Sequence, residues 1–262
     1  MAKQKEIFQV PLGETKVLLH TCCAPCSSAI IECLMKHGVT PVIYYCNPNI
    51  YPHEEYEIRK NECTRYAESL GLEIIDADYD HENWLECVKG LENEPERGGR
   101  CLKCFKLRLL RTAEYAAAHG IRVITSTLAS SRWKSLDQIN EAGEWACSTG
   151  SVGYGRMVSL QHSVEVSGRC SAVPSASAKC SENIEAAAAP DPNGSEWSAC
   201  PTGAVDVSRL GVNMIPPEHE VIWWNHNWRK GGLQERRLEI IRQYDFYNQL
   251  YCGCEFSMRK ED

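Results

Sequence analysis

Three groups of closely spaced cysteines dominate the chemistry that this sequence offers: Cys22, Cys23 and Cys26, then Cys101 and Cys104, then Cys252 and Cys254. The first two groups each contain a Cys-x-x-Cys motif at the predicted start of a helix, which points two thiols to the same side. The partial positive charge of a helix N-terminus also favours the thiolate, which is the form that binds metals. Together these five sulfurs could hold an iron–sulfur cluster or a zinc ion, and their spacing does not distinguish the two.

The third group, Cys252-Gly253-Cys254, has a single residue between its two thiols. A disulfide over so short a span closes a tight, strained ring, and a strained disulfide is easily reduced. Such a pair suits catalysis better than structure, because a dithiol that opens and closes can deliver two electrons. Cys252 and Cys254 are therefore candidate catalytic residues.

The composition is that of a soluble globular protein: the 262 residues are 43% hydrophobic and 24% charged, with a net charge of −7. Residues 1–15 lack the apolar stretch of a secretory signal, and no run of about 18 apolar residues predicts a membrane span. We therefore expect a cytoplasmic protein with no membrane partner, in a compartment that keeps thiols reduced. In that setting fifteen cysteines indicate metal binding or redox catalysis. The isolated cysteines at positions 33, 46, 63 and 87 are expected to pack as small hydrophobic side chains.

Strand-like and helix-like patterns alternate along the first 145 residues and predict an α/β fold. We expect strands at residues 17–21, 41–46, 72–77, 121–128 and 221–224, and helices at 25–37, 53–71, 82–90, 101–120 and 234–249. Asp80 is a candidate N-cap of the third helix. Such alternation predicts a parallel sheet with helices on both faces, in which ligands bind beyond the carboxyl ends of the strands. Cys22 and the Asn-Pro-Asn loop at 47–49 both follow predicted strand ends.

Residues 146–217 differ in character from the segments 1–145 and 218–262, which we assign to the α/β catalytic core. They are acidic and rich in Ser, Ala, Gly and Pro, which predicts a partly flexible insertion. The insertion contains a Cys-Pro-Thr-Gly-Ala-Val sequence similar to the tail of a ferredoxin cluster motif, and cysteines at positions 147, 170, 180 and 200. The Cys-x-x-Cys-x-x-Cys that should precede such a tail is absent, so we expect a surface insertion and no second cluster.

Five motifs in combination resemble a known family: LLHTCCAPCSS, YYCNPNIYPHEEYEIR, CLKCFKLRL, TSTLASS and QYDFYNQLYCGCEFS. Over residues 16–143 and 221–260 the chain is similar to the epoxyqueuosine reductases of the cobalamin-independent QueH type. The resemblance implies an oxidoreductase that converts epoxyqueuosine to queuosine in the anticodon loop of transfer RNA. It also implies a Rossmann-like fold akin to the PP-loop (HUP-like) nucleotide-binding domains. Because HTCCAPCSS replaces their glycine-rich phosphate loop, nothing here indicates ATP hydrolysis.

The same resemblance implies roles for the cysteine groups. Cys22, Cys23, Cys101 and Cys104 match the positions that bind a [4Fe–4S] cluster, and Cys252 with Cys254 matches a redox-active pair. Some relatives carry an aspartate at the position of Cys26, as a ligand to a second, mononuclear metal. Cys26 is therefore a candidate metal ligand whose role the resemblance leaves open. An electron donor, which the sequence does not identify, would have to re-reduce the dithiol.

An acidic protein needs a local basic surface to bind RNA. Residues 97–111 carry six basic side chains and no acid, and residues 228–242 carry five against two glutamates. Both segments adjoin proposed redox cysteines and could contact phosphates, although solvated helix faces are the commoner explanation of such charge. Rings and amides near the 47–49 loop could hold an unstacked base. The candidate substrate-binding residues are Tyr45, Asn47, Asn49, Tyr51, Arg100 and Arg108.

Two other interpretations stay open. A thiol–disulfide oxidoreductase built on Cys23-Ala-Pro-Cys26 would use a motif of the thioredoxin kind, but it leaves the other two cysteine groups without a role. A zinc-stabilised RNA-binding module would contain stoichiometric zinc and would show no redox titration. Metal analysis separates both from an iron–sulfur reductase.

Overall fold

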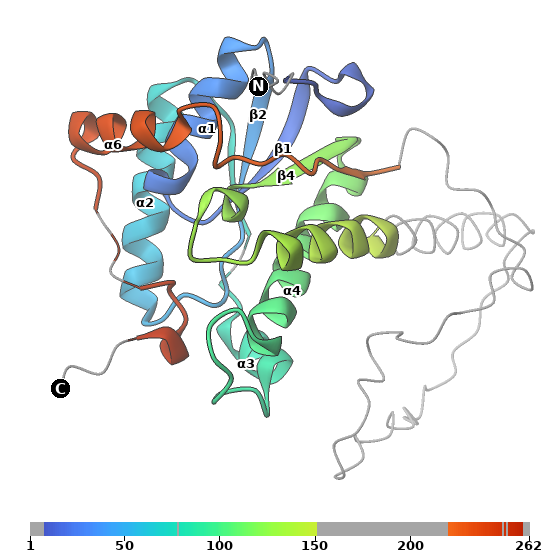
Figure 1. Cartoon of the computed structure of the whole chain (residues 1–262), viewed down its shortest axis with the longest axis vertical. Coiled ribbons are helices and arrows are strands. Elements are labelled where there is room, and N and C mark those ends of the chain that lie inside the picture. The colour runs from blue at the N-terminus through green and yellow to red at the C-terminus, as the bar shows by residue number, and fades with distance from the viewer. Residues whose placement is uncertain (1–7, 78, 151–219, 248, 250, 259–262) are drawn as a thin grey trace, which may run out of the picture. The chain divides into compact units, whose positions relative to one another are not determined.

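The structure, a computed structural model, describes residues 8–77, 79–150, 220–247, 249 and 251–258 (Figure 1). All of these belong to one compact unit of the chain, formed by Met1–Met157 and Ile215–Asp262. Most of the predicted insertion, residues 151–217 with the cysteines at 170, 180 and 200, lies outside the described residues.

A five-stranded, all-parallel sheet forms the centre of this unit, and helices surround it. The strand order is β3-β2-β1-β4-β5, with β1 at Lys16–Thr21, β2 at Thr40–Tyr45, β3 at Ile74–Asp76, β4 at Val123–Ser126 and β5 at Ile222–Trp223. The predicted α/β class is confirmed. Its finer assignment to the PP-loop or HUP-like folds stays a prediction.

The strand order reverses beside β1. The chain moves outward from β1 to β2 and β3, and then returns to place β4 on the other side of β1. In doubly wound sheets a reversal of this kind leaves a crevice beyond the carboxyl ends of the two central strands, and ligands bind there. Cys22 follows β1 directly, and Thr127 follows β4 directly, so both lie at this crevice.

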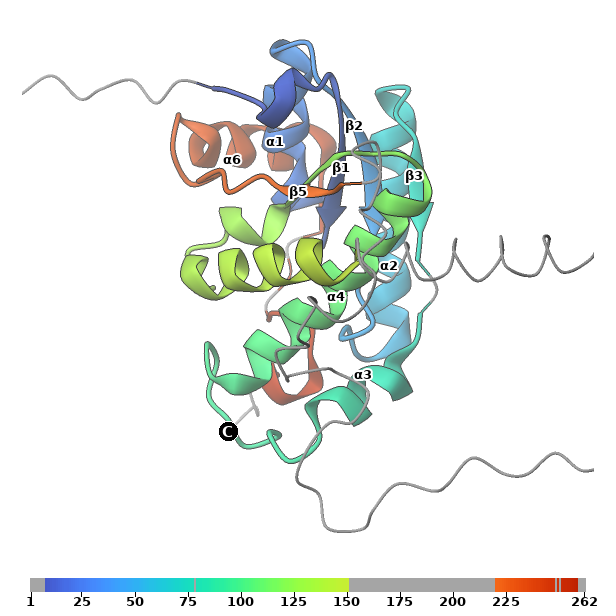
Figure 2. The same cartoon turned by 90° about the vertical axis from the view of Figure 1, so that its right-hand side faces the viewer.

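The helices pack in two groups, which Figure 1 separates most clearly; Figure 2 shows the same helices turned by 90°. In one group α1 (Ala24–Lys36) packs against α2 (His53–Ser69) and α6 (Leu233–Tyr244). In the other, α4 (Gly99–Ala118) packs against β1, β4 and α3 (His81–Val88). The described residues also form three short 3-10 helices, at Pro11–Gly13, Thr127–Ser130 and Glu255–Ser257.

The central strands are buried on both faces, as strands of a covered parallel sheet must be. Val17, Leu18 and Leu19 of β1 have no exposed surface. Two ionic contacts fix α6 to α1: Arg236 donates to both carboxylate oxygens of Glu32, at 2.7 and 2.8 Å. Arg237 Nε donates to the Pro25 carbonyl at 2.8 Å, and this contact ties α6 to the first turn of α1, beside the cysteines.

Element boundaries differ from the predicted ones where side chains or backbone end a pattern early. The strand expected at 121–128 stops at Ser126, whose hydroxyl accepts from Leu128 N and starts a 3-10 helix. The helix expected to reach 249 stops at Tyr244, because Asp245 adopts a left-handed conformation with φ of 51°. Asp80 caps α3 as predicted, accepting from Asn83 N at 3.4 Å.

A helix at residues 136–150 was not among the predicted elements. Its buried residues include Ile139, Ala142, Gly143, Ala146 and Cys147, at helical spacing but with little side-chain volume. Gly143 on this helix allows the Trp223 ring of β5 to pack against it, because a Cβ there would lie 2.1 Å from Trp223 Cδ2. In the part of the chain that the structure describes, no helix combines the length and apolar character that a membrane span requires.

Candidate active site

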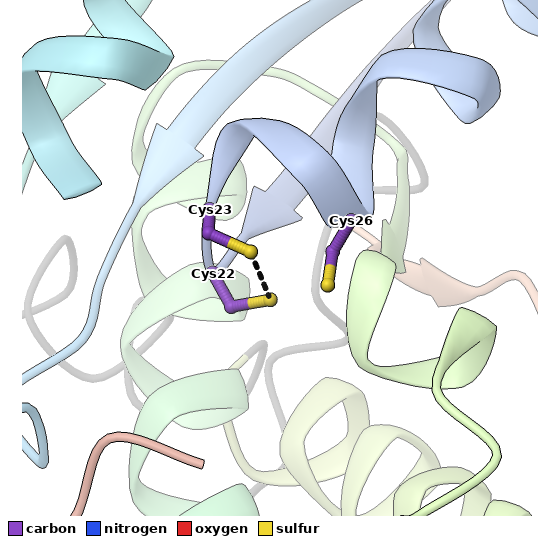
Figure 3. Close-up of side chains that lie close together, drawn as sticks. All are labelled: Cys22, Cys23 and Cys26. Carbon is purple, nitrogen blue, oxygen red and sulfur yellow. Dashed lines mark hydrogen bonds between the residues drawn. The ribbon is translucent and has the colours of Figure 1, made fainter. Parts of the chain in front are cut away.

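Cys22, Cys23 and Cys26 gather where β1 gives way to α1. β1 ends at Thr21, Cys23 is the N-cap of α1, and Pro25 fits the first turn, where no backbone N–H is needed. Figure 3 shows the three side chains turned toward one another. Their sulfurs lie within 4.8 Å of one another, with Cys22 Sγ 3.8 Å from Cys23 Sγ. Within the described ranges this is the only group of three or more His, Cys, Asp or Glu side chains that lie close enough together to share a metal ion.

The pKa values of the three thiols are shifted in opposite directions. Hydrogen bonds from Cys23 and then Cys26 lower the pKa of Cys22 well below its ordinary value. The same contact with Cys22 raises the pKa of Cys23, and it raises that of Cys26 to about 12. Thr127 Oγ1 also donates to Cys22 Sγ at 3.4 Å and accepts from Cys22 N at 3.2 Å. The group therefore concentrates negative charge on Cys22, as a cation-binding thiolate site requires.

A cavity of about 610 Å³ joins the three cysteine groups. Six cysteines from all three groups line it: Cys22, Cys23, Cys26, Cys101, Cys252 and Cys254. Burial raises the pKa of Cys101, and it raises that of Cys254 to about 11. The remaining candidate, Cys104, is buried next to the cavity and packs with Cys254 and Trp84.

The cysteines of α4 are nevertheless separate from the first group. Cys101 lines the same cavity as Cys22, but the compact set of sulfurs within 4.8 Å contains neither Cys101 nor Cys104. The structure thus brings the predicted cluster ligands to one region without bringing all their sulfurs into mutual contact. Their roles as ligands stay a prediction.

A buried ion pair positions the Cys252–Cys254 segment. Arg59 on α2 is 3% exposed and pairs with Glu55, with Nη2 2.6 Å from Oε1. The same guanidinium donates to the carbonyls of Tyr251 and Cys252, at 3.4 Å each. These contacts join residues almost two hundred positions apart in sequence and hold the dithiol segment at the cavity wall.

Gly253 allows the dithiol segment to approach α2 closely. Its φ is +115°, and a Cβ there would lie 3.0 Å from both Arg59 Nη1 and Ile50 Cγ1. Its carbonyl accepts from Tyr51 N at 2.8 Å. The glycine is therefore required by both the backbone conformation and the space available.

Gly253→Ala should displace the Cys252–Cys254 segment. We expect a loss of stability of about 1–3 kcal/mol, and a drop in reductase rate of about tenfold or more at unchanged metal content. Gly90→Ala is the matched control, because Gly90 also has a positive φ, of +80°, but no atom lies within 4 Å of its Cβ position. Thermal unfolding, metal analysis and rate measurements test the pair, and equal rates for the two variants would contradict this role of Gly253.

Arg108 places a buried positive charge beside the thiols. It is 2% exposed, and it donates to the Cys46 carbonyl at 3.1 Å and to Asn47 Oδ1 at 2.5 Å. Its Nη1 lies 4.0 Å from Cys104 Sγ, and it forms no ion pair with a carboxylate of the described residues. A buried guanidinium needs a compensating anion. Thiolates on the neighbouring cysteines would provide it, so the surroundings suit an anionic metal–thiolate group.

His20 is a core histidine. It has no exposed surface, and its ring nitrogens lie 2.8 Å from Ser126 Oγ and 3.1 Å from the Cys46 carbonyl. Burial, and then the charge of Arg108, lower the pKa of His20 to about 3. The ring therefore stays neutral and links β1 to β4 and to the end of β2.

The predicted substrate-binding residues differ in their access to a ligand. Tyr45 and Asn47 have no exposed surface and bond internally, Tyr45 to the Tyr56 carbonyl and Asn47 to the Thr21 carbonyl. Asn49 and Arg108 are also buried. These four side chains shape the end of the sheet and present no face to a base in this structure. Tyr51, in contrast, is 42% exposed.

Arg100 lines the cavity while it holds a loop in place. Its Nη1 donates to the carbonyls of Leu91, Glu92 and Glu94, at 2.6 Å for the last two. The guanidinium also lies over the Phe256 ring, with Cζ 5.4 Å from the ring centroid. Arg100 is thus fixed at the cavity wall and, at 2% exposure, presents little surface to a ligand.

Five basic residues and one acidic residue line the cavity: Arg59, Arg97, Arg100, Lys134 and Arg237 against Glu96. Three other basic side chains of the two predicted segments pair with carboxylates within the protein: Lys106 with Glu141, Arg111 with Asp80 and Arg236 with Glu32. The basic surface therefore concentrates around the cysteines. The sequence patterns did not indicate a role for Arg59, Trp133 or Lys134, although the TSTLASS motif ends only two residues before Trp133.

Known proteins of one family are similar to this chain. The family model for "Epoxyqueuosine reductase QueH" matches residues 17–167 and 202–260. An epoxyqueuosine reductase QueH from Haemophilus influenzae is 36% identical over 97% of this chain and 76% of its own length. Proteins of the same name from Acinetobacter baylyi and Staphylococcus epidermidis are 35% and 36% identical, over 99% and 94% of this chain and 88% and 77% of their own lengths.

The fold and the cavity define an α/β protein with a thiol-rich site at the strand-order reversal. The chain belongs to the QueH family of epoxyqueuosine reductases. The resemblance inferred from five motifs is thereby confirmed, as is the assignment to the oxidoreductases of queuosine biosynthesis.

Proposed function

We propose that this protein reduces epoxyqueuosine to queuosine in the anticodon loop of transfer RNA, in the cytoplasm. The observation that carries the proposal is the single cavity lined by cysteines from three remote segments of the chain. A chain that needed only one Cys-x-x-Cys for thiol–disulfide exchange would have no use for the other two groups.

Cys22, Cys23, Cys101 and Cys104 are the residues that would hold a [4Fe–4S] cluster. The thiolate character of Cys22 and the buried charge of Arg108 suit an anionic cluster at this position. When bound, the cluster would act as a Lewis acid toward the epoxide oxygen or as a relay for single electrons. Cys26 is the candidate ligand for a second, mononuclear metal, because its sulfur lies within 4.8 Å of the sulfurs of Cys22 and Cys23.

Cys252 and Cys254 would supply the reducing equivalents. The epoxide loses its oxygen and leaves a carbon–carbon double bond, while the two thiols lose two electrons and two protons and become one disulfide. The oxygen leaves as water with those two protons, so atoms and electrons balance. An electron donor must then reduce the disulfide for the next turnover.

The cationic lining would draw the RNA to the cavity. Arg97, Lys134 and Arg237 can attract phosphates, and the partly exposed Tyr51 lies beside the dithiol segment, where its N–H donates to the Gly253 carbonyl. Arg59 holds that segment by its backbone and leaves both thiols at the cavity wall.

Metal analysis and an activity assay test the proposal together. Anaerobically purified protein should contain iron and acid-labile sulfide in equal amounts, close to four of each per chain. With a chemical reductant it should convert epoxyqueuosine to queuosine in transfer RNA, followed by mass spectrometry of the nucleosides. Protein without iron that exchanges disulfides would favour a thiol–disulfide oxidoreductase. Stoichiometric zinc and no redox titration would favour an RNA-binding module.

A further inference from the structure

Trp133 is the most exposed large apolar side chain among the described residues, at 78%. Single exposed apolar side chains are common on protein surfaces and by themselves indicate nothing. Trp133 differs because it lines the cavity that contains the six cysteines. A large aromatic ring left in water at the entrance to a reaction site needs a functional explanation.

The backbone that carries this ring is held by two arginines. Arg97 donates to the Trp133 carbonyl at 2.9 Å and to the Arg132 carbonyl at 3.0 Å. Arg229 donates to the Lys134 carbonyl at 2.8 Å. Trp133 N also donates to Ser131 Oγ at 3.3 Å. Consecutive residues of this loop are therefore fixed, and the exposed ring is presented from a rigid base.

Lys134, the residue after Trp133, connects this loop to the thiols of the cavity. Lys134 lines the cavity and interacts electrostatically with Cys252, Cys22 and Cys26. Adjacent Cα atoms are about 3.8 Å apart, so the side chains of Trp133 and Lys134 leave the backbone close together. Both line the cavity that contains the thiols. A ligand that contacts Trp133 thus has its neighbouring unit within reach of the reacting centre.

The charges beside the Trp133 ring indicate which class of ligand this surface binds. Arg97 and Arg132 are both exposed next to Trp133, and the cavity has five basic residues against one acidic residue. A planar aromatic surface beside cations is the combination that holds single-stranded nucleic acid, because bases stack on the ring and phosphates contact the cations.

We propose that Trp133 is a stacking platform for an unpaired base of the RNA, next to the nucleotide whose modification is reduced. This inference rests on the proposed function, because it takes the anticodon loop as the substrate. Trp133 acts in substrate binding and has no part in electron transfer.

Binding of a fluorescently labelled anticodon stem-loop RNA to the metal-loaded full-length chain tests this platform. Trp133→Ala should weaken binding about 5- to 100-fold, and Trp133→Phe, which keeps a smaller ring, should lose less. Met35→Ala is the control, because Met35 is 40% exposed at the far end of α1 and does not line the cavity. It should bind as wild type does. Iron content should be equal in all four proteins.

An abasic nucleotide identifies the stacked base. Replacing one loop nucleotide beside the target by an abasic one should weaken binding to the wild type, and should have little further effect on Trp133→Ala, since the partner ring is already gone. At saturating RNA, the single-turnover rate of pre-reduced Trp133→Ala should stay within about twofold of wild type, because the loss is one of uniform binding.

Unchanged RNA affinity in Trp133→Ala would contradict the role of Trp133 as a stacking platform. The same conclusion would follow if, at every abasic position, the losses of affinity from Trp133→Ala and from the abasic nucleotide added up independently. Normal affinity combined with slow multiple turnover would assign the ring to docking of the electron donor and overturn RNA stacking. If the wild type binds the RNA but never forms queuosine, the proposed reaction fails while the binding comparison still decides the role of Trp133.

Discussion

Cys252→Ser should abolish queuosine formation and leave the metal content at the wild-type level. A serine hydroxyl cannot form a disulfide with Cys254, so the pair loses its capacity to supply two electrons. We expect the rate to fall by about 10³-fold or more. Nucleoside mass spectrometry of the RNA measures the activity, and iron and sulfide assays on the same sample measure the cluster.

Cys33→Ser is the matched control for this loss. Cys33 is a half-buried free thiol on α1, and it contacts His37 and does not line the cavity. Its removal should change neither iron content nor rate. Normal turnover by Cys252→Ser would show that the electrons reach the substrate without this dithiol.

Cys101→Ser should lose the cluster and, with it, the activity. The thiolate is the ligand that iron–sulfur clusters require, and serine replaces it poorly. We expect iron per folded chain to fall to about a tenth or less of the wild-type value, which separates this variant from Cys252→Ser. Iron and sulfide analysis with visible absorption spectra would detect the difference.

Cys147→Ser controls for the removal of a buried cysteine as such. Cys147 is 7% exposed in the helix at 136–150 and does not line the cavity. It should cost some stability but retain iron. If Cys101→Ser also kept a full complement of iron, α4 would have no part in binding the cluster.

Sequence patterns predicted the position of the first cysteine group because the pattern is local. An apolar strand that ends in Cys22, followed by Pro25 in a first helical turn, fixes a strand–helix junction without reference to the rest of the chain. Asp80 as a helix cap was predictable for the same reason. Both features depend on neighbours a few residues apart.

Features that depend on tertiary contacts were not predictable in this way. The ring of Tyr45 belongs to the core because β2 is a central strand covered on both faces, whereas the same residue type in a loop would be exposed. Arg59 contacts the backbone of Tyr251 and Cys252 across most of the chain length. The periodic pattern of apolar residues in a sequence carries no information about such a long-range contact. The helix at 136–150 gave a weak signal because alanines and a glycine form much of its packed face.

Trapping of thiols after a single turnover shows directly whether Cys252 and Cys254 supply the electrons. Metal-loaded protein is reduced, freed of reductant and mixed anaerobically with one equivalent of epoxyqueuosine-containing RNA, and its free thiols are alkylated before peptide mass spectrometry. We expect queuosine and a Cys252–Cys254 disulfide to form in equal amounts. Queuosine formed while both thiols remain open to alkylation would contradict it.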